Sequence, residues 1–330
     1  MFMPIDRVQL SGTSMRMTNA HNSVPSSPSH PAIFVPSGNV NLAEFLSVNQ
    51  DLIAEGLEAK GAVLFRGFAV ADAIAFDAAI GGYGGENFSY EQSLSNAVRV
   101  NVTARVFTAN EAPPTTEIFL HHEMAQTPVY PSKLFFYCEA AAEQGGATPL
   151  CRSDLLLERM QAELPGPVAE FADKGVRYSN TMPADDDAVS GQGRSWKSTL
   201  SVNDRSGAEA RLSQLGYSWQ WQNDGALRVT TPRLEAMRQT ADGRSTFFNQ
   251  LIAAYRGWSD GRNAASRSIT FGDGGVIDHD AMLHVISIAD DLTYDHNWQT
   301  GDVVLVDNYL VMHGRRPFRG QRRVLASLLR

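Results

Sequence analysis

Two imidazoles and a carboxylate are the side chains of this sequence that could together hold a catalytic metal ion. The first two stand in the segment Ile118–Met124, where His121, His122 and Glu123 follow an apolar run. Side chains two residues apart on an extended chain project to the same side, so His121 and Glu123 can converge while His122 points away. Imidazole nitrogen and carboxylate oxygen together suit a divalent first-row metal. The other register would pair His122 with Met124, which makes a poor site for a hard, oxidisable metal.

A third ligand is predicted far along the chain, at His313. The apolar run Val303–Val306 reads as a buried strand, and the polar Asp307 and Asn308 mark its end. His313 follows a short connector, where a strand leaving a barrel would present a side chain at the mouth. Two histidines and one carboxylate on one side of a metal leave three positions open. Oxygen activation needs such an open face, with two positions for a bidentate co-substrate and one for O2.

A co-substrate with a second carboxylate needs an anchor at its far end. Arg322 and Arg323 follow the third ligand, Arg323 at a spacing of ten residues. The planar guanidinium of arginine matches a carboxylate with two parallel hydrogen bonds and stays charged when buried. Alternation places Arg323 on the same face as Ser327 and Arg322 on the other, so one of the two arginines is expected outside. Thr148, in a Gly-Gly-Ala-Thr segment, offers a hydroxyl donor to the same carboxylate.

Taken together, these motifs resemble those of the taurine dioxygenase superfamily of iron- and 2-oxoglutarate-dependent oxygenases, particularly its clavaminate-synthase-like and syringomycin-biosynthesis hydroxylase branches. The similarity covers nearly everything after residue 40. It includes Gly61–Phe68, Leu120–Met124, Gly145–Pro149, Phe248–Gln250, Phe271–Gly274 and Trp298–Leu325. The resemblance implies a mainly β fold with flanking helices, built around a double-stranded β-helix (jelly-roll) core.

The resemblance also implies which residues hold the iron and the co-substrate. The Fe(II) facial triad would be His121, Glu123 and His313. The distal carboxylate of 2-oxoglutarate would be bound by Thr148 and Arg323. Many relatives carry a second arginine four residues after the first, where this chain has Ser327. Either Arg323 acts alone, or Arg322 assists it.

The reaction implied by the resemblance is the oxidation of an unactivated C–H bond with Fe(II), 2-oxoglutarate and O2, releasing succinate and CO2. In halogenating relatives a small residue at the position of Glu123 frees a coordination site for chloride, so hydroxylation or a related oxidation is favoured here. The implied substrate is an amino acid or amino-acid-derived metabolite of natural-product biosynthesis, free or bound to a carrier protein. A non-catalytic jelly-roll binding protein and a zinc hydrolase with the same ligands are the alternatives.

The chain is predicted to form one domain with an arm. Residues 1–35 are rich in Ser, Pro, Asn and Met, which predicts a flexible N-terminal arm, and residues 36–330 a single oxygenase domain. The polar stretch 183–218 has little periodicity and predicts a long lid-like insertion. Helices are predicted over residues 41–58, 70–80, 154–164 and 246–256. Strands are predicted over residues 61–68, 98–104, 133–140, 147–151, 175–178, 285–288, 302–306 and 323–329.

Composition restricts the class of protein. A hydrophobic share of 43% indicates a substantial core, and a net charge of -8 argues against non-specific binding of nucleic acid or anionic membrane. Two cysteines, Cys138 and Cys151, exclude a disulfide framework and suit a reducing cytoplasm; both are expected to be buried and inert. No apolar stretch approaches the roughly 20 residues that span a bilayer. The chain is expected to be cytoplasmic, with a small-molecule substrate as its partner and an oligomeric state that the sequence does not indicate.

A few polar residues allow two interpretations. Asn249 and Gln250 face substrate or brace the following helix, and Arg315 and Arg316 reach an anionic substrate group or lie in a solvated turn. His279, between two aspartates, is interpreted as part of a loop rather than a second metal site.

Overall fold

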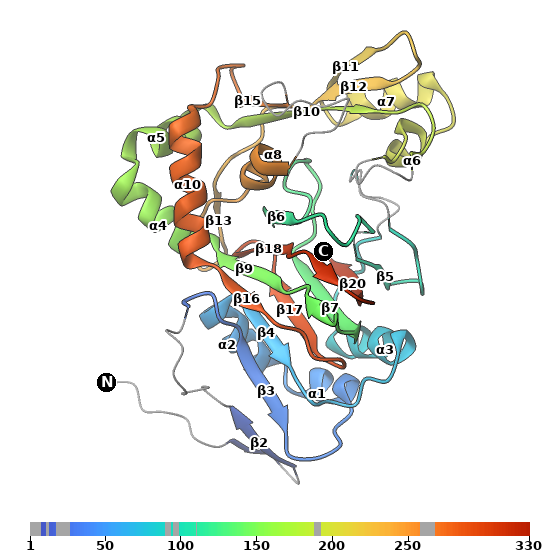
Figure 1. Cartoon of the computed structure of the whole chain (residues 1–330), viewed down its shortest axis with the longest axis vertical. Coiled ribbons are helices and arrows are strands. Elements are labelled where there is room, and N and C mark those ends of the chain that lie inside the picture. The colour runs from blue at the N-terminus through green and yellow to red at the C-terminus, as the bar shows by residue number, and fades with distance from the viewer. Residues whose placement is uncertain are drawn as a thin grey trace.

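The computed structural model of the chain describes residues 27–89, 94, 99–109, 111–187, 193–257 and 268–330, together with two short strands near the N-terminus. Strands occupy the centre of the described structure, and helices lie around them (Figure 1). The predicted class, mainly β with flanking helices, is confirmed.

A long mixed sheet runs through the molecule. Its strands in spatial order are β1 (Val8–Leu10), β2 (Thr13–Met17), β3 (Ala32–Pro36), β4 (Ala62–Phe65), β17 (Val303–Asp307), β7 (Lys133–Ala140), β20 (Arg323–Leu329) and β5 (Phe107–Thr108). The central strands are uninterrupted apolar runs, and β4 is buried at every residue. Such runs are typical of strands covered on both faces. The predicted bounds of β7 and β20 are confirmed.

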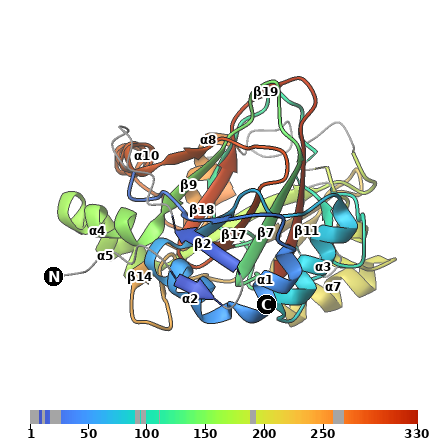
Figure 2. The same ribbon diagram turned by 90° about the horizontal axis from the view of Figure 1, so that it is seen from below.

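Helices cover one face of this large sheet (Figure 2). They are α1 (Leu42–Val48), α2 (Gln50–Lys60) and α3 (Ala73–Tyr83). Phe45, Ile53 and Phe76 from these helices pack with side chains of the sheet in one buried cluster. The single helix predicted over 41–58 is divided at Asn49, whose side-chain amide donates to the carbonyl of Phe45 and ends the first helix.

A smaller sheet faces the other side of the large one. Its strands in spatial order are β16 (Tyr294–His296), β9 (Thr148–Arg152), β18 (Val311–Arg315) and β6 (Ile118–His121). Leu150 and Val311 of this sheet share a buried cluster with Phe136, Val304 and Ala326 of the large sheet. The space between the two sheets is therefore where inward-facing side chains of both can meet.

The outer face of the smaller sheet is covered by a second group of helices. They are α4 (Ser153–Glu163), α5 (Pro165–Lys174), α8 (Leu251–Gly257) and α10 (His279–Leu292). Residues 285–288, predicted as a strand, lie inside α10. Met282, Val285 and Ala289 are buried on one face of that helix. The short β-branched run resembles a strand when it is taken alone, whereas the apolar residues on both sides of it continue at helical spacing.

A third layer is built on the small sheet of β11 (Ser218–Trp221), β12 (Leu227–Thr230), β10 (Val176–Met182) and β15 (Ile269–Phe271). It carries α6 (Trp196–Leu200) and α7 (Arg205–Gln214). These helices fall within the stretch 183–218, which was predicted as a lid-like insertion and in which the sequence indicated no helix. The helical periodicity of apolar residues is weak in this stretch, because α7 buries only Ala208 and Leu212. The short strands β8 (Gln144–Gly145), β19 (Phe318–Arg319), β13 (Arg238–Gln239) and β14 (Ser245–Thr246) complete the described elements.

The predicted N-terminal arm is wrong for residues 27–35. Phe34 on β3 is buried against the helices, and the hydroxyls of Ser27 and Ser29 donate to the carbonyl of Leu292 at 3.0 and 2.7 Å. The run Ala32–Pro36 supplies enough apolar surface to join the large sheet. Most of residues 1–26 lie outside the described residues.

Two further expectations can be compared with the structure. Residues 99–104, the described part of a predicted strand, contain only an isolated bridge between Asn101 and Phe107.

Cys138 and Cys151 are both buried, and burial raises the pKa of each thiol to about 12. Both thiols are therefore protonated and unreactive at neutral pH. Within the described residues, no helix has the length and apolar character needed to cross a membrane.

Gly61 lies between α2 and β4 and packs against β18, the strand that carries His313. It ends α2 with a φ of 74°, and its carbonyl accepts a hydrogen bond from the amide of Asp307 at 2.8 Å. A Cβ on this residue would lie 2.4 Å from Cγ2 of Val311 in β18. Both the backbone conformation and the packing therefore require glycine.

We expect Gly61→Ala to lower the free energy of unfolding by about 2–4 kcal/mol, since left-handed strain and overpacking act together. Gly243→Ala is the matched control, because Gly243, in the turn between β13 and β14, has a φ of 86° but no atom within 4 Å of the point that a Cβ would occupy. It should cost about 1–2 kcal/mol. Urea denaturation of both variants measures the difference, and equal losses would show that contact with β18 does not matter.

Candidate metal centre

His121, Glu123 and His313 meet between the two facing sheets. Oε2 of Glu123 lies 3.9 Å from Nε2 of His121 and 3.5 Å from Nε2 of His313. The two imidazole rings are 4.4 Å apart between centroids. Among the described residues, this is the one group of three or more His, Cys, Asp or Glu side chains whose ligand atoms lie within 4.8 Å of one another.

Strand pairing brings the two histidines together. β18 pairs antiparallel with β6, and His313 is the direct partner of His121. His313 was expected beyond a strand, but it lies in the middle of β18, which also pairs with β9. The strand was missed because Gly314 interrupts its pattern. A Cβ there would lie 2.3 Å from the carbonyl oxygen of Ile118, so the close pairing of the two strands requires glycine.

The chain leaves β6 directly after His121 and turns. Met124 has a φ of 59°, a left-handed conformation that is uncommon for a residue with a side chain. His122 points away from the cluster, with its Nδ1 2.5 Å from the carbonyl of Asn308 and its ring packed on Phe248. Glu123 points to the same side as His121, as the alternation along the sequence suggested.

Asn308 holds the backbone of Glu123 from both sides. Its Oδ1 accepts the amide of Glu123 at 2.7 Å, and its Nδ2 donates to the carbonyl of Glu123 at 3.1 Å and to that of Pro131 at 2.8 Å. Asn308 is fully buried. In the sequence it only marked the end of a strand, and nothing there indicated that it orients a candidate ligand.

The protonation states suit metal binding. His121 donates from Nδ1 to the carbonyl of Phe119 at 2.8 Å, which leaves the lone pair of Nε2 directed at the cluster. Burial, and then the nearby His313, lower the pKa of His121 to about 4. Burial by itself would raise the pKa of Glu123, but the guanidinium of Arg99 and the contact with His313 hold it well below its usual range. At neutral pH the cluster thus offers a neutral His121 and an ionised carboxylate.

The donor set fits a divalent first-row metal. Ligand atoms about 2.1 Å from a metal and at right angles to each other lie about 3 Å apart, so the observed separations need only a small contraction. Two imidazoles and one carboxylate are the ligands of non-haem Fe(II) oxygenases that keep positions open for co-substrate and O2.

Thr148 begins β9 and is buried. Its Oγ1 accepts a hydrogen bond from Nε1 of Trp298 at 2.9 Å. Because the oxygen is an acceptor in that contact, the hydroxyl proton is available for another group. Trp298 was noted in the sequence only as the beginning of a shared segment, and its contact with Thr148 comes from the fold.

The structure separates Arg323, the first residue of β20, from Arg322 just before it. Arg323, the first choice from the sequence, lies on the outside, half exposed and paired with Glu139 at 2.6 Å. Arg322 is only partly exposed, and its Nε donates to the carbonyl of Gly146 at 3.0 Å. A bulge follows Arg323. Since alternation alone cannot say which face is inward, the choice needed the sheet packing.

Arg322 has the properties of an anion-binding group. Burial, followed by repulsion from Arg315, lowers its pKa to about 10, so it remains charged at neutral pH. No carboxylate pairs with it in the part of the chain that the structure describes. A partly buried charge without a counter-ion is costly, and an anionic ligand would lower that cost.

The residues with two interpretations have structural roles. Arg315 is buried and donates to the carbonyls of Ala112, Pro113 and Thr116. Arg316 forms ion pairs with Glu117 and Asp295. Arg315 does not lie in the solvated turn that was considered, whereas Arg316 stands in the connection after β18 and is partly exposed; the described contacts of both are to the protein.

The Asn249–Gln250 pair braces the neighbouring elements. Oδ1 of Asn249 accepts the amide of Leu251 at the start of α8, and Nε2 of Gln250 donates to the carbonyl of His122 at 2.9 Å. His279 was expected in a loop, but it lies in the first turn of α10, where its ring contacts Tyr255. It belongs to no candidate metal cluster of the described residues.

A family model described as "Taurine catabolism dioxygenase TauD, TfdA family" matches residues 25–329. The chain belongs to this family. It is 39% identical over 304 residues to the clavaminate synthase-like protein At3g21360 of Arabidopsis thaliana, covering 92% of each chain. It is 28% identical over 322 residues to the dapdiamide synthesis protein DdaC of Enterobacter agglomerans, covering 94% of each. The structure of PvcB from Pseudomonas aeruginosa shares the fold with a TM-score of 0.56 at 13% identity, covering 97% of this chain and 93% of PvcB.

Membership of the TauD/TfdA family makes this chain an Fe(II)- and 2-oxoglutarate-dependent oxygenase. The observed cluster of two imidazoles and a carboxylate is consistent with that chemistry.

We expect Asn308→Ala to weaken Mn(II) binding by about 10- to 100-fold, as the loss of an outer hydrogen bond to a ligand commonly does. It should also lower the free energy of unfolding by about 1–3 kcal/mol, because the buried amide of Glu123 loses its partner. Electron paramagnetic resonance of free Mn(II) and urea denaturation measure the two effects. Asn297→Ala, at an exposed residue, is the control and should change neither. Unchanged metal affinity in Asn308→Ala would contradict the orienting role.

Proposed function

We propose that this oxygenase hydroxylates an unactivated C–H bond of an amino acid or amino-acid-derived metabolite, coupled to the conversion of 2-oxoglutarate and O2 to succinate and CO2. The observation that carries the proposal is the convergence of His121, Glu123 and His313 in the space between two facing sheets. We also propose that these two sheets are the halves of a double-stranded β-helix, which their order and the antiparallel pairing around β17 and β18 support.

The residues of the site divide the work. His121, Glu123 and His313 would hold Fe(II), and the bound metal supplies the activation of O2. Thr148 and Arg322 would bind the distal carboxylate of 2-oxoglutarate, by a hydroxyl donor and a partly buried guanidinium. The protein's part is to orient the co-substrate and the substrate and to keep water out.

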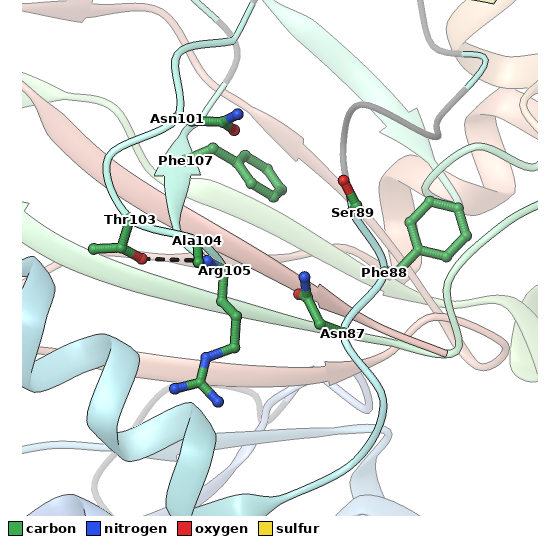
Figure 3. Close-up of a pocket in the computed structure, with 8 residues that line it drawn as sticks. All are labelled: Asn87, Phe88, Ser89, Asn101, Thr103, Ala104, Arg105 and Phe107. Atoms are coloured by element: carbon green, nitrogen blue, oxygen red, sulfur yellow. Dashed lines mark hydrogen bonds between the residues drawn. The ribbon is translucent and has the colours of Figure 1, made fainter. Parts of the chain in front are cut away.

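The substrate class rests on separate observations. DdaC acts in dapdiamide synthesis by its name, which supports an amino-acid-derived substrate here. The cavity of about 260 Å³ drawn in Figure 3 is lined by Asn87, Asn101, Thr103 and Arg105 among others, and by none of the three candidate metal ligands, so the substrate class does not rest on it. Glu123 occupies the position that a halogenating enzyme would leave to chloride, which supports hydroxylation.

The proposal is tested first by an anaerobic titration. Wild-type protein with Fe(II) and 2-oxoglutarate should show a visible charge-transfer band, and aerobic turnover with a screen of amino acids and carrier-bound derivatives should release succinate. We expect His121→Ala and Glu123→Ala to lose the band and succinate release together, because each removes a metal ligand.

A folded wild-type protein without the band would refute the proposal. Turnover that does not need O2 would indicate a zinc hydrolase, and ligand binding without metal a binding protein.

Arg322 and Arg323 provide a matched pair of substitutions for the proposed co-substrate site. We expect Arg322→Met to weaken 2-oxoglutarate binding by about 10- to 100-fold, the value of a charge-assisted hydrogen-bonded pair. Arg323→Met should bind within about twofold of wild type, because it removes only a half-exposed ion pair. Equilibrium titration of the metal-loaded proteins measures both. A larger loss in Arg323→Met than in Arg322→Met would reverse the assignment.

A further inference from the structure

Arg99 is a buried cation in contact with the carboxylate of the candidate metal centre. Its side chain is 7% exposed, and that of Glu123 is 4% exposed. Nη2 of Arg99 lies 2.9 Å from Oε1 of Glu123 and 3.2 Å from Oε2. The guanidinium also lies over the ring of Phe107, 5.3 Å from its centroid. Packing against a rigid ring limits the directions from which this arginine can donate.

Both oxygens of Glu123 accept from Nη2 of Arg99, but they differ in their other contacts. Oε2 is the atom that lies near both imidazoles, at 3.9 Å from His121 and 3.5 Å from His313. Oε1 is the atom nearer to Arg99. A metal bound by the two histidines would therefore meet Oε2 first. To bring Oε1 to the metal as well, the carboxylate would have to rotate away from the buried guanidinium and lose a charge-assisted hydrogen bond.

We propose that Arg99 is a positioning residue that makes Glu123 bind the metal through Oε2 alone. This inference rests on the proposed iron and 2-oxoglutarate site. The number of vacant positions depends on the carboxylate, since two histidines and one carboxylate oxygen leave three positions. A carboxylate bound through both oxygens would leave two, so that 2-oxoglutarate and O2 could not both bind. Arg99 thus controls how many positions the co-substrates share.

The division of contacts around Glu123 supports this role. Asn308 fixes the main chain of Glu123 from both sides, through its amide and its carbonyl, and leaves the side chain to other partners. The remaining freedom of Glu123 is rotation of its side chain, and Arg99 acts on that rotation. The two residues therefore restrict different parts of the same ligand.

The test compares Arg99→Met, which removes the donor, with Arg99→Lys, which keeps the charge but not the planar guanidinium. Mn(II) is the metal for affinity measurements, and Fe(II) under anaerobic conditions is the metal for the charge-transfer band with 2-oxoglutarate. We expect Arg99→Met to keep its metal and to bind 2-oxoglutarate on the order of 10-fold more weakly, with a diminished band. Arg99→Lys should fall between Arg99→Met and wild type.

Arg152→Met is the matched control. It breaks a pair with Asp154 of similar burial that lies outside the metal cluster, so it should lower stability but leave the 2-oxoglutarate affinity and the band unchanged. Wild-type 2-oxoglutarate affinity and band in folded Arg99→Met would overturn the inference. So would an effect confined to the KM of the substrate, which would make Arg99 a substrate-binding residue. Loss of the band in wild type itself would instead refute the proposed function.

Discussion

The pairing of β6 with β18 is the interaction on which the site depends. It places His121 and His313 next to each other across two strands, which no local feature of either segment could do. The turn after β6 then returns Glu123 to the same side, where its ionised carboxylate lies between the imidazoles. A buried carboxylate needs compensation, and the guanidinium of Arg99 and the contact with His313 provide it.

The surrounding sheets make this arrangement rigid. The strand of His313 pairs on its other side with β9, which begins at Thr148 and so connects the metal centre to the co-substrate residues. Arg322 stands just before β20 of the large sheet and donates to the carbonyl of Gly146, close in sequence to Thr148. The residues proposed to hold the metal and the 2-oxoglutarate carboxylate therefore come from segments that are far apart in the sequence.

Outer contacts decide how the ligands behave. Asn308 holds the main chain of Glu123, the carbonyl of Phe119 selects the tautomer of His121, and Trp298 directs the hydroxyl of Thr148. Such second contacts commonly set the affinity of a metal site as strongly as the ligands themselves. The His-x-Glu and His residues of the family motif thus depend on contacts with other residues, and the motif itself does not predict those contacts.

The sequence by itself determined the ligand types, their alternation on either side of His122, and the apolar strands that form the centre of the fold. These follow from local chemistry and from periodicity, which a linear chain displays. Only the tertiary structure decided that Arg322 rather than Arg323 faces inward, that residues 285–288 are helical, and that Arg99 contacts Glu123. Each of these depends on which face of an element is covered by a distant part of the chain, and spacing along the sequence carries no information about that.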